Sequence, residues 1–227
     1  MKTFKKSLTQ LKAIEQYQKG NPDDNKHYPS LELVRLEKIF FKSKPGKILD
    51  YAIGGGCNAF HFIKNKYDLI GIDTNPSLRK LLNKVAKDKK LKMPNFKVLR
   101  ANSTKLPFKD NYFDYIYAFS VLSLLGDKSK ISNLLSEFQR ILKKNGKIIL
   151  DINDHNSEFS ANKKQIKKNV FVSRVNGNDV RTYCCKNISE FENLIKPYFK
   201  IKDKGFSSFK VFKRQIKEFI ICAENIL

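Results

Sequence analysis

A glycine turn between two acidic strand ends constrains this chain more than any other feature. The apolar run Lys47–Leu49 ends at Asp50, the turn Gly54–Gly56 follows, and a second apolar run ends at Asp73, while the segment from Cys57 has helical spacing. This order is the layout of a nucleotide-binding crossover, because residues without side chains let a ligand approach the backbone. The second acid suits a ribose diol, since a carboxylate accepts hydrogen bonds from two hydroxyls at once.

The alternation that starts at Lys47 predicts an α/β fold. Five strands joined by helices imply parallel pairing with right-handed crossovers. Two last strands have only a loop between them, so they should pair antiparallel. We therefore expect a seven-stranded, mostly parallel, doubly wound sheet with an antiparallel last strand. The expected strands are at about 47–51, 68–73, 96–101, 114–119, 147–153, 199–205 and 216–223, and the helices between the first five are at about 57–65, 76–89 and 128–143.

Local signals set the ends of these elements. Pro76 is expected at the first position of the second helix, because its fixed φ suits a helix start. The pair Asn145–Gly146 tolerates a left-handed backbone and should close the third helix. Ser189 has the spacing of a capping box that opens a further helix, which ends near Pro197.

The rest of the chain departs from the alternation. Residues 1–45 are expected to form a helical cover, with helices at about 3–18 and 30–42, the second capped by Ser30. Residues 46–227 then form the main domain. Within it, residues 156–186 are expected to be an insertion after strand five that carries a hairpin about the turn Asn176–Gly177. We expect the insertion and the cover to form a substrate pocket together.

Composition excludes several classes of protein. The chain has 227 residues, of which 41% are hydrophobic, so it can bury a core without disulfides or metals. Its 4 Cys show no metal-ligand spacing, which predicts reduced thiols, a cytoplasmic protein and no metal site. No apolar stretch is long enough for a transmembrane segment.

The formal net charge of +23 favours acidic partners but identifies none. The 38 Lys and 7 Arg are spread along the whole chain. Specific phosphate and base contacts favour the planar fork of Arg, so this imbalance favours a solvated lysine-rich surface over nucleic-acid binding.

Taken with a further string, these motifs resemble the class I (Rossmann-like) S-adenosylmethionine-dependent methyltransferases. The similarity is greatest to the type-11 group that includes ubiquinone and menaquinone methyltransferases. Its most family-specific string is Leu106–Phe108 followed by Tyr112–Asp114, and Ile141–Lys147 resembles the family's turn into strand five. The resemblance covers about 45–154 by motif and the rest by element order only. It implies a methyltransferase that uses S-adenosylmethionine and a small-molecule acceptor.

The resemblance assigns cofactor contacts along the chain. Asp50 matches the acid of the first motif and would hold the methionine ammonium. Gly54 and Gly56 match two of its glycines, while Ala52 stands where the family has the first glycine. We expect Ala52 to need no positive φ, so that the turn stays functional. Asp73, with Thr74 beside it, would bind the ribose.

Two further pairs complete the implied cofactor site. Asn102 and Ser103 occupy the place where the family usually meets the adenine edge, commonly with Asp. Phe119 and Ser120, after the fourth strand, would line the cavity into which the reactive methyl points. All these residues fall beyond the carboxyl ends of strands, where ligands bind in such sheets.

The reaction needs a base only if the acceptor is a hydroxyl. The candidate catalytic residues are His155 and Asp154, just beyond strand five, and His27 and Tyr28 on the expected cover. A lone His near a loop is more often an ordinary polar residue than a catalytic base.

Three alternative functions remain open at this point. Gly54–Ala59 also fits the glycine pattern of an NAD-dependent oxidoreductase, although Asp50 beside a pyrophosphate would be unfavourable. A catalytically inactive protein that binds S-adenosylmethionine is suggested by Ala52. An RNA methyltransferase is suggested by the charge alone, and would show steeply salt-dependent RNA affinity.

Overall fold

The structure, a computed structural model, describes residues 28–100, 103, 105–160, 163–175, 178–211 and 214–227. The expected helix at about 3–18 lies outside these ranges. The chain divides into two compact units, Met1–Pro107 and Phe108–Leu227. The main sheet has seven strands in the order β3-β2-β1-β4-β5-β10-β9, and β6, β7 and β8 form a second, three-stranded sheet. The expected α/β fold, with a mostly parallel sheet and antiparallel final strands, is confirmed.

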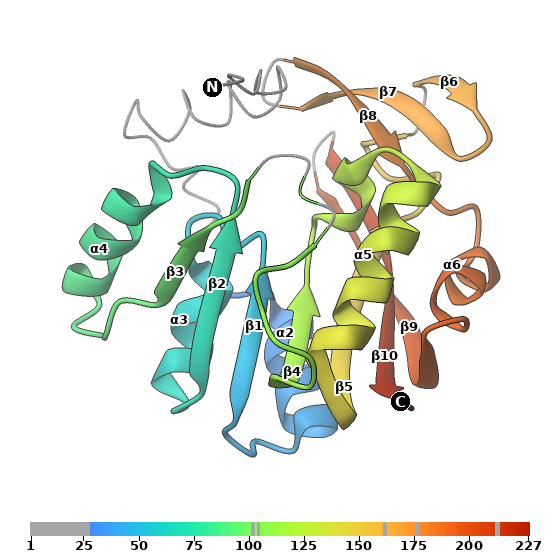
Figure 1. Ribbon diagram of the computed structural model, residues 1–227. Coiled ribbons are helices and arrows are strands. Elements are labelled where there is room, and N and C mark those ends of the chain that lie inside the picture. Colours follow the sequence, from blue (N-terminus) through green and yellow to red (C-terminus); the bar gives the residue numbers. More distant parts are fainter. Residues whose placement is uncertain (1–27, 101–102, 104, 161–162, 176–177, 212–213) are drawn as a thin grey trace, which may run out of the picture. The chain divides into compact units, whose positions relative to one another are not determined.

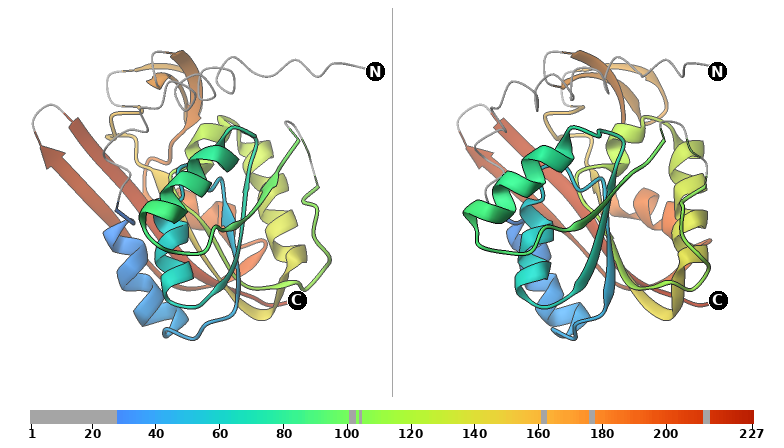
Figure 2. Two further views of the ribbon diagram at one scale, coloured as in Figure 1. Left: turned by 90° about the vertical axis from the view of Figure 1, so that its left-hand side faces the viewer. Right: turned by 60° about the vertical axis from the view of Figure 1, so that its left-hand side comes forward.

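The first unit contains three parallel strands with helices along one face (Figures 1 and 2). The predicted helix at about 30–42 begins as expected, because the Ser30 hydroxyl accepts a hydrogen bond from the Leu33 amide at 3.4 Å, but its second half is a π-helix. The strands are β1 (Lys47–Tyr51), β2 (Asp68–Asp73) and β3 (Asn95–Val98), and the helices are α2 (Leu31–Leu36), η2 (Glu37–Phe41), α3 (Cys57–Lys64) and α4 (Leu78–Asp88).

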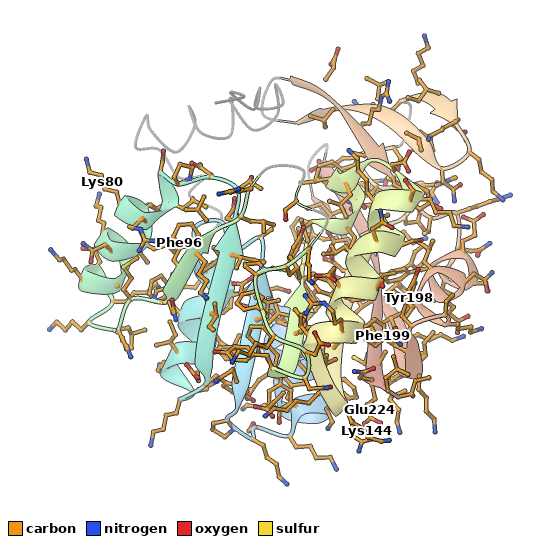
Figure 3. The ribbon with its side chains drawn as sticks, viewed as in Figure 1. Lys80, Phe96, Lys144, Tyr198, Phe199 and Glu224 are labelled. Atoms are coloured by element: carbon orange, nitrogen blue, oxygen red, sulfur yellow. The ribbon has the colours of Figure 1, made fainter. Side chains whose placement is uncertain are left out.

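The start of α4 corrects one prediction. Pro76 precedes the helix, which begins at Leu78 with Ser77 as its N-cap. The Asn75 side chain accepts from the Ser77 amide at 3.0 Å and so closes a turn around Pro76. Farther along α4, Arg79 lies over the ring of Phe96 in β3, at 5.4 Å from its centroid. This contact holds α4 against β3. Phe96 is labelled on this strand in Figure 3. The predicted strand, 96–101, extends beyond the observed end of β3 at Val98.

The second unit contains the remaining strands of the main sheet. β5 pairs parallel with β4 and antiparallel with β10, which also pairs antiparallel with β9. The helices α5 and α6 lie along one face of these strands (Figure 1). The strands are β4 (Phe113–Ala118), β5 (Leu142–Asn153), β9 (Phe199–Val211) and β10 (Arg214–Asn225), and the helices are η3 (Leu122–Leu125), α5 (Lys128–Ile141) and α6 (Ile188–Ile195).

Three local predictions in this unit need correction. The cap of α6 is Asn187, whose side chain accepts from the Glu190 amide at 3.0 Å, and Ser189 lies inside the helix. Asn145 is left-handed as expected, at φ 61°, but it lies within β5 because α5 already ends at Ile141. Strands β9 and β10 are both longer than predicted.

The expected hairpin in the insertion is confirmed as β7 (Val170–Val175) and β8 (Asn178–Tyr183), which pair antiparallel. A further strand, β6 (Lys164–Lys167), pairs with β7 and was not predicted, because its sequence is mostly Lys and Gln. The boundaries 1–45, 46–227 and 156–186 stay predictions. All four cysteines are free thiols. Within the described ranges no helix could span a membrane, and no metal-ligand cluster is found.

Candidate cofactor site and catalytic residues

The glycine turn after β1 contains three residues in the left-handed region of the backbone. Ala52 has φ 64°, Gly54 has φ 53° and Gly56 has φ 80°. The expectation that Ala52 needs no positive φ is therefore wrong. Its backbone adopts the conformation that glycine permits freely, so the alanine preserves the shape of the turn at a cost in strain.

A backbone hydrogen bond and side-chain packing hold the turn against β2. The Ile53 amide donates to the Ile72 carbonyl at 3.0 Å, which closes the turn against the neighbouring strand. A side chain on Gly71 would collide with Ile53, and one on Gly56 would meet Leu82 at 2.6 Å. Two of the glycines thus serve close packing of the turn.

Asp73 and the glycine turn form one hydrogen-bonded unit. The Gly54 amide donates to Asp73 Oδ2 at 3.2 Å, and the Asn75 amide donates to Asp73 Oδ1 at 3.1 Å. Each carboxylate oxygen has further lone pairs and can accept from a ligand hydroxyl as well. Asp73 and Thr74 are half-buried, so the pair is accessible from one side.

Asp50, the acid that precedes the turn, lies deeper in the protein than Asp73. Asp50, near the end of β1, is only 4% exposed. Beside it, burial and then the charge of Asp73 raise the pKa of Tyr51 to about 12, so its phenol stays neutral. No Lys or Arg occurs in 50–57 or 71–77. The carboxylates beside the turn therefore favour a cationic or polyol ligand over a diphosphate.

In the second unit, the loop after β4 is held by a residue that the sequence analysis missed. The Ser120 amide donates to both carboxylate oxygens of Asp151, at 2.7 and 2.9 Å, and Asp151 in β5 is 1% exposed. Ser120 is itself left-handed, at φ 57°, and Phe119 is half-buried. The signal for Asp151 was an acid at the end of the apolar run Ile148–Leu150.

Asp154 and His155 follow β5 and already have protein partners. The buried Asp154 carboxylate accepts from the Asn156 amide at 2.6 Å and lies 3.1 Å from Lys217 Nζ. His155 Nε2 lies 3.2 Å from Asn169 Oδ1, and its ring packs edge-on against Phe171. Both residues thus connect the end of β5 to neighbouring segments.

The contacts of His155 extend to a cavity of about 340 Å³ within the second unit. Asn169 lines this cavity and donates through its amide to Glu190 at 2.8 Å and to the Tyr183 hydroxyl at 3.4 Å. Lys128 stands at the same cavity. Asn169 of the insertion therefore connects His155 to this cavity.

The other predicted site residues are less informative. His27 and Asn102 lie outside the described residues. Tyr28 is 81% exposed. Ser103 is exposed, and its hydroxyl donates to the Lys105 carbonyl at 2.6 Å. The structure thus brings Gly54 and Asp73 into direct contact, and leaves the adenine and cover residues as predictions.

Comparison with known families supports the resemblance in sequence. Residues 49–150 match a family model described as a methyltransferase domain. A ubiquinone/menaquinone biosynthesis C-methyltransferase from Shewanella frigidimarina is 31% identical over 133 residues, which cover 57% of this chain and 49% of that protein. The chain thus spans about half the length of this curated relative.

Solved structures show the same fold. A methyltransferase from Methanosarcina mazei superimposes with a TM-score of 0.70 at 21% identity, covering 83% of this chain and 97% of that one. The 1,6-didemethyltoxoflavin-N1-methyltransferase from Burkholderia thailandensis, solved with 1,6-didemethyltoxoflavin and S-adenosylhomocysteine, gives 0.65 at 12% identity, covering 96% and 88%. At these identities the likeness concerns the fold alone.

Proposed function

We propose that this chain, whose residues 49–150 match a methyltransferase-domain family model, is a class I methyltransferase of the type-11 group that transfers a methyl group from S-adenosylmethionine to a small-molecule acceptor. The observation that carries the proposal is the hydrogen bond from the Gly54 amide to Asp73. It makes the glycine turn and the sugar-binding acid a single rigid recognition element, which a helix cap or an ordinary turn would not require.

The residues of the turn suit S-adenosylmethionine chemically. Asp50 and the turn amides would hold the amino-acid part, and Asp73 with Thr74 would hold the ribose diol. The cofactor supplies an activated methyl group on a positively charged sulfur, so the protein contributes mainly alignment and exclusion of water. Two carboxylates, in segments 50–57 and 71–77 that contain no Lys or Arg, suit that positive charge.

Asp151 acts on the site by positioning the loop after β4. Because both its oxygens accept from the Ser120 amide, it fixes the backbone that follows Phe119. This is the backbone to which we assign the wall of the methyl-transfer cavity. A buried acid bound to backbone in this way orients the loop without touching a substrate.

Among the candidate bases we favour His155. The Asp154 carboxylate is buried against Lys217 and an amide, whereas His155 is half-buried and connects through Asn169 to the cavity of about 340 Å³. If the acceptor is a hydroxyl, His155 would take up its proton. His27 and Tyr28 remain candidates on the N-terminal segment.

The acceptor that we propose is a small molecule, bound with the help of the insertion 156–186. The similar proteins support this choice, since their names describe C-methyl transfer in ubiquinone and menaquinone biosynthesis and N1-methyl transfer to 1,6-didemethyltoxoflavin. Lys surfaces without an Arg cluster make RNA a weaker choice. The free cysteines support a cytoplasmic location.

Ala52 favours one alternative function. Its positive φ and its methyl group at the turn suit a protein that binds S-adenosylmethionine but does not turn it over. Measuring cofactor binding and methyl transfer separately distinguishes the two. Formation of S-adenosylhomocysteine with a panel of small acceptors supports the enzyme, and binding without turnover on every acceptor supports the rival.

The proposal predicts that Asp73→Asn weakens binding of S-adenosylmethionine by about tenfold to a hundredfold. The amide keeps one acceptor oxygen but loses the charge-assisted bonds to the diol, each worth about 1.5–3 kcal/mol. Titration calorimetry with S-adenosylmethionine, S-adenosylhomocysteine and NAD measures the effect.

Asp68→Asn is the matched control, because Asp68 opens the same strand at its opposite end. That variant should bind the cofactor as the wild type does. Unchanged affinity in Asp73→Asn, or tighter binding of NAD than of S-adenosylmethionine by the wild type, contradicts the proposed function.

A further inference from the structure

The end of the β9–β10 hairpin, described at residues 204–211 and 214–217, exposes two aromatic side chains. Phe206 is 68% exposed and Phe209 is 55% exposed, although both lie in a regular strand. β9 is the last strand of the sheet, and its pairing with β10 continues past the Glu218 position at which β10 leaves β5 (Figure 2). Phe209, opposite Ile216, therefore lies beyond the part of β10 that pairs with β5, whereas Phe206, opposite Phe219, lies beside the last residues of that pairing.

The two phenylalanines lie on opposite faces of the hairpin. Phe206 pairs with Phe219 and Phe209 pairs with Ile216, with no register shift between these pairs. Because side chains alternate across a strand, residues three apart point to opposite sides. A flat protein partner would cover only one of these faces, so the pattern favours a medium that surrounds the hairpin end.

The charge of the same segment indicates an anionic medium. Residues 204–217 contain four Lys, one Arg and no Asp or Glu, within a chain of net charge +23. Lys204 pairs with Glu192 at 2.8 Å, and Lys217 pairs with Asp154 at 3.1 Å. Lys210 is exposed. Phe side chains flanked by Lys are typical of segments that enter the headgroup layer of acidic membranes, where the ring is buried and the ammonium meets lipid phosphate. The segment 204–217 contains more Lys than Arg, whereas a site that binds RNA favours Arg.

We propose that the end of the β9–β10 hairpin docks peripherally on an anionic lipid bilayer, with Phe206 and Phe209 entering the headgroup layer and the exposed Lys210 contacting lipid phosphate. The attachment is reversible, because two phenylalanines and a few cations supply far less binding energy than a spanning helix. This inference does not depend on the proposed methyl transfer.

A tryptophan reporter tests insertion directly. The chain contains no Trp, so Phe209→Trp introduces a single fluorophore at the hairpin end. Its emission should shift to the blue on addition of phosphatidylcholine–phosphatidylglycerol vesicles, and brominated lipid should quench it. Ile39→Trp is the control, because Ile39 is 71% exposed on η2 in the other unit, and its emission should not change. An equal response at both positions, or none at 209, overturns the proposal.

Vesicle co-sedimentation tests the energetics. Phe206→Ser with Phe209→Ser should lower the partition coefficient on anionic vesicles about tenfold or more, and Lys210→Gln should lower it about fivefold. The matched controls Ile39→Ser and Lys87→Gln remove the same kinds of group from the first unit and should bind like the wild type.

Three results would overturn the proposal. They are equal binding to phosphatidylcholine vesicles without anionic lipid, a wild-type dimer in light scattering that Phe206→Ser with Phe209→Ser dissociates, and single-stranded RNA binding that exceeds vesicle binding and is lost in that double variant. The last two assign the hairpin end to a second copy of the chain and to RNA.

Discussion

Ala52 shows how a single residue can preserve the geometry of a motif while departing from its sequence. The family motif has glycine at this position, and the alanine adopts a φ of 64°. A left-handed backbone costs a residue with a side chain about 1–2 kcal/mol. The sequence identified the substitution but not the conformation, because the sign of φ is set by the closure of the turn through Ile53 and Ile72.

We predict that Ala52→Gly stabilises the protein by up to about 1 kcal/mol, because relief of backbone strain exceeds the added entropy of the unfolded chain. Urea unfolding measures the change. Ala59→Gly, inside α3, is the control and should destabilise by about 1 kcal/mol. If Ala52→Gly destabilises as much as the control does, the strain at position 52 is absent.

At the scale of helices and strands, the sequence predicted which elements exist, and whether each is a helix or a strand, better than the residues at which they begin and end. The parallel strands and α3 follow from apolar runs and helical spacing, which tertiary contacts reinforce. The start of α6 was misplaced because Ser189 and Asn187 both suit an N-cap, and only the fold selects Asn187. The length of β9 was missed because Gly205 and frequent Lys weaken a strand pattern that pairing with β10 restores.

The start of α5 allows a prediction about pH. Asp127 caps the helix through the Ser129 amide at 2.8 Å and pairs with Lys167 of β6 at 2.6 Å. These bonds, that from Lys167 first, hold the pKa of Asp127 well below its usual range. Asp127→Asn keeps the cap but removes the charge, so it should cost about 0.5–1 kcal/mol at neutral pH.

Because the folded pKa is the lower one, this stabilisation is fully present above the unfolded value of about 4 and is lost as pH falls below it. Chemical unfolding of the wild type and Asp127→Asn should therefore converge in acid. Lys167→Gln should show the same loss at neutral pH. A difference between wild type and Asp127→Asn that grows as the pH falls contradicts the assignment.

For the whole molecule, the number of main-sheet strands and their mostly parallel pairing followed from the sequence, whereas the acceptor did not. Alternating elements restrict topology to a few arrangements, so a seven-stranded sheet was predictable. Fold alone does not select a substrate, which depends on side chains such as His155 and Asn169 that no motif brings together in the sequence.

The net charge of +23 also acts on the whole molecule. Mutual repulsion among the lysines should oppose the folded state at low ionic strength, and salt should screen it. We expect the melting temperature to rise when potassium chloride is added up to physiological strength, and sodium chloride to act equally. A fall, or a difference between the two salts, would show that repulsion is not the dominant effect.

The space that Gly71 leaves for Ile53 joins two positions that are distant in the chain. Gly71 does not need to touch a ligand, but the room that it leaves for Ile53 determines how close the turn lies to Asp73. Related sequences should consequently vary at these two sites in step, with any bulkier residue at the position of Gly71 accompanied by a smaller one at that of Ile53. A bulkier residue at only one of the two positions would move the turn away from Asp73. The affinity for the ligand would then fall before the fold lost stability.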